Sequence, residues 1–272
     1  MKKYRTIDVL VSTFGDRVGN LKNVIKQPRP GVTYIIGHQG ADIGTLDILT
    51  LEREDVRYFP LDSVGVTKSR NFLLMKSESD ICYFCDDDIT LDSRFDEVLL
   101  NAHNNDSSEV ITLKILDENG NPRKKELSTT VTQRNIFNIL SVGTIEISLK
   151  RECLGNIRFC EFMGAGTSIP IGDEAVFLSD LLKNGHRISY HNIAIASHPI
   201  ESSGAAPSFD TIFARGMTIR LVYGFFCGLP LALVFIFLRR NLIFKSNFFG
   251  GLKMFWSGFF LKNINFLVNK RK

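Results

Sequence analysis

The stretch ICYFCDDDITLDSRF (residues 81–95) runs from five apolar or weakly polar residues directly into three aspartates, Asp86, Asp87 and Asp88. The apolar part predicts a buried β-strand, so the acids would stand at its carboxyl end. Carboxylates this close raise each other's pKa values, and a positive charge is therefore expected beside them. Mg²⁺ and Mn²⁺ prefer oxygen ligands, and Asp86 and Asp88 are expected to face one such ion together. A solvated turn or a helix cap is the alternative interpretation.

The segments on either side of this stretch alternate between strand and helix patterns. Strands are expected at residues 6–12, 32–38, 56–59, 80–85, 110–116, 141–149, 188–190 and 193–196, and helices at 67–75, 93–102 and 173–184. Such alternation is typical of an α/β domain with a mainly parallel sheet flanked by helices. Ligands of these sheets bind at the carboxyl ends of the strands, where the three aspartates are expected.

Charge is divided unequally along the chain. Residues 211–272 contain ten Lys or Arg and no Asp or Glu, which leaves a net charge of −6 on residues 1–210 within a total of +4. The basic part also holds 12 of the 22 Phe and the single Trp, a composition that favours a lipid surface over nucleic acid. We therefore expect an α/β domain at 1–204 and a basic, aromatic, membrane-associated helical tail at 205–272.

The tail contains the uncharged segment LVYGFFCGLPLALVFIFL (residues 221–238), which is long enough to cross a bilayer. A single crossing from the cytosol would leave the eight basic residues after Leu238 outside, against the positive-inside rule. Gly228 and Pro230 are expected to bend the segment instead, and residues 242–261 have the composition of an interfacial helix. The tail is thus expected to dip into or lie on one leaflet. A pair of apolar helices buried in a homo-oligomer is the alternative.

Cysteine usage favours a reducing cytosol, because the five cysteines are odd in number and irregularly spaced. The chain also shows no signal-peptide pattern after Met1, since the short apolar run that follows is broken by Asp8. Cys82 and Cys85 form a C-x-x-C pair. Residues three apart on a strand point to opposite faces, so packed core cysteines are expected rather than a redox or zinc site.

Four segments, IDVLVSTFGDR (7–17), GVTKSRN (65–71), CYFCDDDI (82–89) and FMGAGTSIPIGDEAVFLSDLLKNG (162–185), resemble the GT-A glycosyltransferases in order and spacing. The resemblance is closest to family 2, which includes bacterial polysaccharide-assembly enzymes. It covers roughly residues 6–200. No single motif is specific, but the four in this order and spacing are a strong signal together.

The resemblance implies a donor site and a metal site. The loop after the first strand would border the nucleotide, Asp86 would lie by the ribose and Asp88 would bind a Mn²⁺ or Mg²⁺ ion that bridges the donor diphosphate. The donor-binding residues it implies are Thr13, Phe14, Asp16, Asp42, Arg70, Asn71, Asp86 and Asp87, and the metal ligands are Asp88, Asp86 and His198. Asp42 and His198 have simpler alternatives, as a turn residue and a structural histidine.

The resemblance also implies a catalytic base. Gly172-Asp173-Glu174 with Phe177 matches a pattern whose second acid is usually the base, which assigns the role to Glu174. Asp173 is its rival, because the family more often uses aspartate. Favourable acidic charge at a helix N-terminus is the simpler explanation of both. The preceding loop, Gly164-Ala165-Gly166, is expected on the acceptor side or is a tight turn.

These implications predict an inverting, metal-dependent hexosyltransferase. Its donor is a nucleotide-sugar, UDP-linked by family precedent, and its acceptor is a saccharide linked to a polyprenyl diphosphate lipid. The expected location is the cytoplasmic face of a bacterial inner membrane, reached through the tail, with no nucleic-acid partner. A metal-dependent nucleotidyltransferase and a non-catalytic, membrane-tethered binding module of the same fold are the alternatives, and an oligomer is left open.

Overall fold

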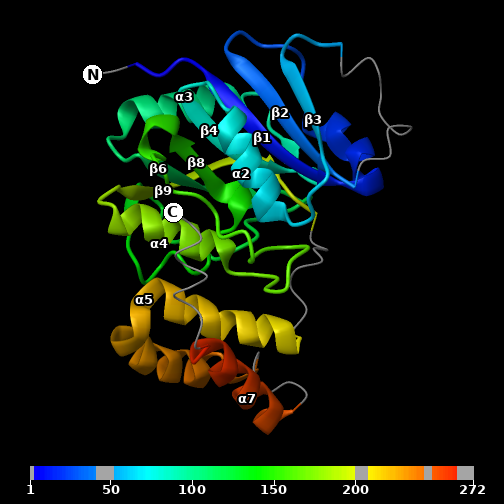
Figure 1. The fold of residues 1–272 in the computed structure, drawn as a ribbon. Helices are drawn as coiled ribbons and strands as arrows, with labels where there is room; N and C mark the ends of the chain where they lie inside the picture. Colours follow the sequence, from blue (N-terminus) through cyan, green and yellow to red (C-terminus); the bar gives the residue numbers. More distant parts are fainter. Residues whose placement is uncertain (1–2, 41–51, 200–207, 242–246, 262–272) are drawn as a thin grey trace.

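A computed structural model of the 272-residue chain describes residues 3–40, 52–199, 208–241 and 247–261. In this part of the chain a mixed nine-stranded sheet carries helices on both faces, and a layer of apolar helices lies below it (Figure 1). The expected α/β class, with flanking helices and an apolar helical tail, is confirmed.

The first half of the sheet is parallel. It consists of β1 (Ile7–Phe14), β2 (Val32–Gln39), β3 (Val56–Leu61) and β4 (Ile81–Asp86), in the order β3-β2-β1-β4. Because parallel strands end at the same edge, Ser12 of β1 lies beside Asp86 of β4. The three aspartates therefore stand at the edge where ligands of such sheets bind.

The second half of the sheet is mixed. It contains β5 (Thr90–Leu91), β6 (Val110–Leu116), β7 (Thr132–Arg134), β8 (Ile147–Lys150) and β9 (Ile188–Ser197). β8 pairs antiparallel with β4 and β6, whereas β9 is parallel to β6 and antiparallel to β5 and β7. The strand expected at 141–149 is shorter, because a 3-10 turn, η3 (Thr144–Glu146), precedes β8. The two strands expected at 188–196 are one, because a register shift opposite Leu113 and Lys114 accommodates its polar centre.

The helices cover the two faces of the sheet unequally. They are η1 (Gly15–Asn23), α2 (Val66–Lys76), α3 (Phe95–Asn105), η4 (Arg151–Cys153), α4 (Asp173–Lys183), α5 (Phe209–Leu238) and α7 (Phe248–Phe259). α2, α4 and part of α5 share one core with the sheet, and η1 and α3 share the other. Cys82 lies in the first core and Cys85 in the second, as the strand period predicts. Burial raises the pKa of the Cys82 thiol to about 12, in keeping with a packing role.

A close approach between α2 and the sheet aims one side of this helix at the acids. A Cβ on Gly37 of β2 would lie only 2.7 Å from Ser69 Oγ, so glycine is required for α2 to lie this near. Ser69 also exchanges a hydrogen bond of 2.9 Å with Ser12 of β1. These contacts fix the rotation of α2 about its axis and place Arg70 over the carboxyl end of β4.

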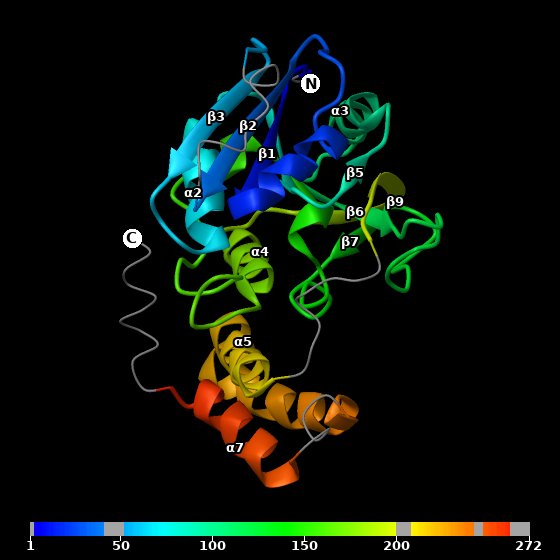
Figure 2. The same ribbon diagram turned by 90° about the vertical axis from the view of Figure 1, so that its right-hand side faces the viewer.

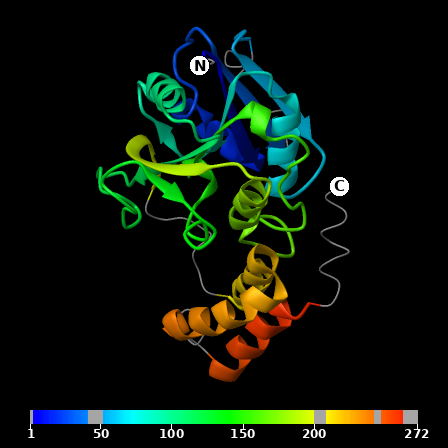
Figure 3. The ribbon, with the colours of Figure 1, turned by 90° about the vertical axis from the view of Figure 1, so that its left-hand side faces the viewer.

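The long helix α5 is bent into two parts at Gly224, whose φ of 75° and ψ of −170° are not helical. The bend was expected at Gly228 and Pro230, but both lie inside the second part; a positive φ is easily adopted by glycine, which makes Gly224 the breaking point. The first part packs below α4 and contributes Ala214, Met217 and Val222 to the core of the α/β domain. The second part of α5 turns back beneath the first part and lies beside α7 (Figures 2 and 3).

Candidate active site

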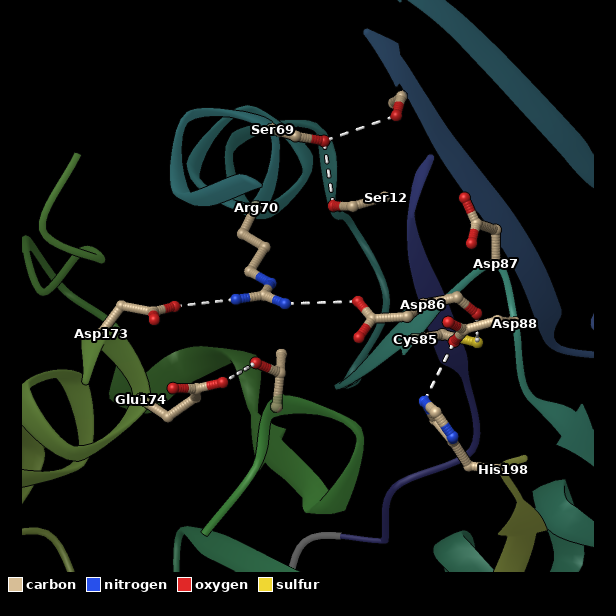
Figure 4. A network of polar contacts seen from close by, with 12 residues as sticks. Ser12, Ser69, Arg70, Cys85, Asp86, Asp87, Asp88, Asp173, Glu174 and His198 are labelled. Atoms are coloured by element: carbon tan, nitrogen blue, oxygen red, sulfur yellow. Dashed lines mark hydrogen bonds and ion pairs between the residues drawn. The ribbon is translucent and has the colours of Figure 1, made fainter. Parts of the chain in front are cut away.

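Arg70 joins two acidic segments at the carboxyl edge of the sheet. Its Nη2 lies 3.2 Å from Asp86 Oδ1, and its Nη1 donates to Asp173 Oδ2 at 2.8 Å (Figure 4). The Arg70 and Asp173 side chains are only 6% and 3% exposed. Although burial alone would lower it, the charges of Asp86 and Asp173 raise the pKa of Arg70, so the guanidinium stays ionised. The segments around Asp86 and Asp173, expected to meet in one site, do so through this residue.

A second arginine, Arg17 of η1, contacts the other two aspartates. Its Nη2 donates to Asp87 and, at 2.8 Å, to Asp88 Oδ2. Burial raises the pKa of Asp87, although the Thr13 hydroxyl and Arg17 oppose this. The positive charge expected beside the aspartates is therefore present within the chain, on Arg70 and Arg17. Asp86 and Asp88 have different partners, so in this structure they do not converge on a single group.

The residues around Asp88 fit a divalent metal ion. Asp88 Oδ1 is buried, has no well-aligned hydrogen-bond partner and faces His198 Nε2 at 3.3 Å. His198 Nδ1 donates to the Pro199 carbonyl at 2.7 Å, which leaves Nε2 available as a ligand when the ring is neutral. The described residues contain no cluster of three or more potential metal ligands. One carboxylate and one imidazole suffice where substrate phosphates complete the coordination, as Mg²⁺ sites often do.

Asp173 and Glu174 open α4 directly after Gly172, which adopts φ 97° at the N-cap. Burial, followed by the neighbouring Glu174 charge, raises the pKa of Asp173 well above its ordinary range. Arg70 opposes this shift, but its single charge is shared with Asp86. Glu174 is half-buried and accepts a hydrogen bond of 2.7 Å from Thr144 Oγ1 of η3. Within the described part of the chain, arginine forms an ion pair with Asp173 and none with Glu174.

The other residues singled out from the sequence lie around this centre. Thr13 is buried at the end of β1, whereas Phe14 and Asp16 are exposed beside it. Asn71 turns away from Arg70 and donates to the Phe159 carbonyl and to Glu161. In the Gly164–Gly166 loop, the Ala165 carbonyl accepts from Val66 N at the start of α2, and a Cβ on Gly164 would lie 3.2 Å from Asp173 Cγ. Asp42 lies outside the described residues.

Some of the residues that build the site were not identified from the sequence. Arg17 follows Asp16 directly, and its charge was the one available signal. Thr144 gave none, because it lay within an expected strand. His38 was also missed: its Nε2 donates to the Gly15 carbonyl at 2.9 Å and its Nδ1 accepts from the Tyr58 hydroxyl, which anchors the start of η1 to β2.

Comparison with protein families gives one match. The model described as Glycosyl transferase family 2 matches residues 19–165, more than half of the chain. The matched segment includes Arg70 and Asp86 to Asp88 and ends before Asp173 and Glu174. No curated protein matches this chain in sequence.

Solved structures similar to this chain include several of S. aureus TarS. TarS 1-349 superposes with a TM-score of 0.63 at 16% identity, covering 93% of this chain and 81% of that chain. Its complex with UDP-GlcNAc gives 0.61 at 15% identity with the same coverage. The longer TarS structure gives 0.60 at 16% identity, covering 88% of this chain and 44% of that one. At such low identities the similarity shows the fold, and that fold is the GT-A fold.

Proposed function

This chain belongs to glycosyl transferase family 2, and from that premise we propose that it is an inverting, metal-dependent hexosyltransferase. The observation that carries the proposal is the Arg70 bridge, which brings the acids at the end of β4 within one side chain of the acids at the start of α4. Glycosyl transfer needs acids in two roles, at the donor and at the acceptor hydroxyl.

Glu174 is the proposed base. It takes the proton from the acceptor hydroxyl as the oxygen attacks the anomeric carbon, while the bond to the nucleoside diphosphate breaks on the opposite side. A single displacement of this kind inverts the anomeric configuration, through an oxocarbenium-like state of the kind met in glycoside hydrolysis. Asp173, buried and bonded to Arg70, is better suited to holding Glu174 and Arg70 in position.

Asp88 and His198 are the proposed ligands of Mn²⁺ or Mg²⁺. The ion, when bound, neutralises negative charge that grows on the departing diphosphate. Asp86 remains the proposed partner of the donor ribose, with the Arg70 contact fixing its orientation. The donor is proposed to be UDP-linked, which the TarS complex with UDP-GlcNAc supports by similarity of fold.

The tail supports attachment to a membrane. Among the described residues, α5 is the one helix long and apolar enough to cross a bilayer. Yet its first part belongs to the core of the α/β domain, and the second, residues 225–238, is about 21 Å long at 1.5 Å per residue. That is short of the roughly 30 Å hydrocarbon core, so we propose that the tail inserts into one leaflet.

The lower layer of the tail has the surface that such insertion requires. Phe226 is 88% exposed and Phe249 is 80% exposed. The large apolar side chains exposed on the second part of α5 and on α7 and its C-cap are Phe225, Phe226, Leu233, Val234, Phe237, Leu238, Phe248, Phe249 and Phe260. With the basic charge of residues 211–272, this layer suits an anionic leaflet. A lipid-linked saccharide acceptor and the cytoplasmic face of a bacterial inner membrane are the corresponding proposals.

Incubation of the purified protein with UDP-sugars and Mn²⁺ tests the activity. Release of UDP that is lost in Asp88→Asn and in Glu174→Gln is expected. Pyrophosphate release from a nucleoside triphosphate would identify a nucleotidyltransferase instead, and the absence of both reactions would indicate a binding module. Flotation with vesicles, with and without anionic lipid, tests the attachment, and protease access to a C-terminal tag from the cytosolic side of sealed inside-out vesicles distinguishes insertion from crossing.

A further inference from the structure

Arg17 is bound to the carboxylates where a metal ion is expected. Its Nη2 is shared between Asp87 and Asp88, at the start of η1 and directly after β1. The Asp87 side chain is only 2% exposed, and Arg17 is its ion-pair partner among the described residues. Removing a buried carboxylate from its cation is costly, so this contact stabilises the site when no other cation is bound.

The backbone of η1 is fixed, but the end of the Arg17 side chain is not. Val18 and Leu21 of η1 are buried, and His38 holds the Gly15 carbonyl. The Arg17 side chain is 49% exposed, in contrast to the 6% of Arg70. The guanidinium can therefore exchange one partner without moving the main chain, and its several N–H donors let it keep Asp87 while it leaves Asp88.

A metal ion on Asp88 and the guanidinium of Arg17 would be two cations on one carboxylate. Like charges at this separation repel, and the repulsion is weakened only in part where the site is half exposed. An incoming nucleoside diphosphate changes this balance, because its phosphate oxygens are acceptors that suit an arginine.

We propose that Arg17 is a displaceable internal cation that competes with the divalent ion for Asp88 until the donor diphosphate binds. The inference rests on the proposed metal site. Competition of this kind makes the binding of metal and donor cooperative. Without donor, Arg17 keeps Asp88 and metal binding is weak. With donor bound, the guanidinium would keep Asp87 and turn its free N–H groups to the diphosphate, which would leave Asp88 free to hold the metal ion.

Binding of Mn²⁺ alone tests the proposal, measured by the electron paramagnetic resonance signal of the free ion. Without nucleotide, Arg17→Gln is expected to bind Mn²⁺ about fivefold more tightly than the unaltered protein. The substitution removes a half-exposed positive charge that would repel the ion. The enhancement of Mn²⁺ affinity by saturating UDP is expected to shrink by a similar factor, because the substitution removes a competition that exists only without nucleotide. Since coupling is reciprocal, the enhancement of UDP affinity by Mn²⁺ should shrink by the same factor. Arg17→Lys, which retains the charge without the fork, should behave more like the unaltered protein.

Lys22→Gln is the matched control, because it removes one charge from the same helix at an exposed position. Equal Mn²⁺ affinity in Arg17→Gln, Lys22→Gln and the unaltered protein would overturn the proposal. Absence of Mn²⁺ binding in all of them would overturn it together with the metal site, while UDP-sugar binding and UDP release would still test the transferase activity separately. If Arg17→Gln folds poorly, Arg17→Gln with Asp87→Asn removes the unpaired buried charge and allows the same titration.

Discussion

Arg70 Nη1 lies 2.8 Å from Asp173 Oδ2, although 103 residues separate them in the chain. The pair joins α2 to the start of α4, across the carboxyl edge of the sheet. Because Arg70 also reaches Asp86, one buried guanidinium holds the two acidic segments of the proposed site in a fixed relation. Changes at Arg70 should therefore affect folding and activity together.

Arg70→Met is expected to lower the free energy of unfolding by about 3–5 kcal/mol, because it leaves the buried Asp173 and the partly exposed Asp86 without their cation. Arg70→Lys should cost less, since it retains the charge but cannot reach both acids in the same geometry. Urea unfolding measures both. Arg57→Gln is the control and should change little, because it removes a partly exposed arginine 3.5 Å from the exposed Glu78. A stability of Arg70→Met equal to that of the control would contradict the bridging role.

The raised pKa of Asp173 predicts a pH dependence of stability. Burial, and then the Glu174 charge, raise it from an ordinary 3.8 to about 8, so the folded state holds the proton more tightly than the unfolded state does. Stability from this group is complete below the ordinary pKa and is lost as pH rises through about 8. Relative to Asp173→Asn, which has no such proton, the protein should lose on the order of 1 kcal/mol between pH 7 and pH 9.

The measurement is urea unfolding of both proteins at several pH values. Only the difference between the two curves is informative, because other groups titrate in both proteins. Glu174→Gln should reduce the pH effect, since the Glu174 charge is one cause of the shift. Parallel curves for the unaltered protein and Asp173→Asn would show that Asp173 is ionised throughout, held so by Arg70.

The proposed metal ligands predict a defined loss of affinity. Asp88→Asn and His198→Gln should each weaken Mn²⁺-dependent UDP binding by at least about tenfold, the range seen when groups that hold or orient a metal are removed. Isothermal titration with UDP, in the presence of Mn²⁺ and then of EDTA, separates the metal-dependent part. His186→Gln is the control, because this histidine lies in the turn after α4 and away from the aspartates. Unchanged binding in Asp88→Asn would remove Asp88 from the metal site.

Much of the sheet and the acidic part of the site were predictable from local pattern. β1, β2 and β4 are runs of β-branched and apolar residues that the strand period identifies, and Asp86 to Asp88 follow β4 without a break. Asp173 and Glu174 follow a glycine at a helix start, which is also a local signal. The helix at 173–184, expected to end at Gly185, is α4 within one residue.

The partners of these acids were less predictable, because they depend on contacts between distant segments. Arg17 reaches Asp87 from the turn after β1, which His38 anchors through the Gly15 carbonyl. Thr144 reaches Glu174 from η3, a turn that lies where a strand was expected. The position of the bend in α5 also depends on tertiary contacts. Gly228 and Pro230 carry the stronger breaking signals, but Gly228 packs against Phe259 inside the helical layer and the chain turns at Gly224.

Two glycines set the crossing of α5 and α7 and predict how the tail can be loosened. A Cβ on Gly216 would lie 2.0 Å from the Phe255 carbonyl oxygen, and one on Gly258 would lie 2.0 Å from the Phe213 carbonyl oxygen. The helices must therefore separate to accept alanine at either position. We expect each alanine variant to show a net loss of about 1–2 kcal/mol of stability, because overpacking against backbone costs about 3 kcal/mol and alanine regains only about 1 kcal/mol over glycine within a helix.

Urea unfolding and vesicle flotation together test this crossing. Gly258→Ala should displace α7 and reduce flotation with anionic vesicles, because the exposed Phe side chains of α7 then no longer form one layer with α5. Gly19→Ala is the control, since an added Cβ there meets no atom within 4 Å. If the Gly216 and Gly258 variants unfold at the same urea concentration as the control, the two helices do not cross this closely. The surface proposed to enter one leaflet would then need a different arrangement of α7.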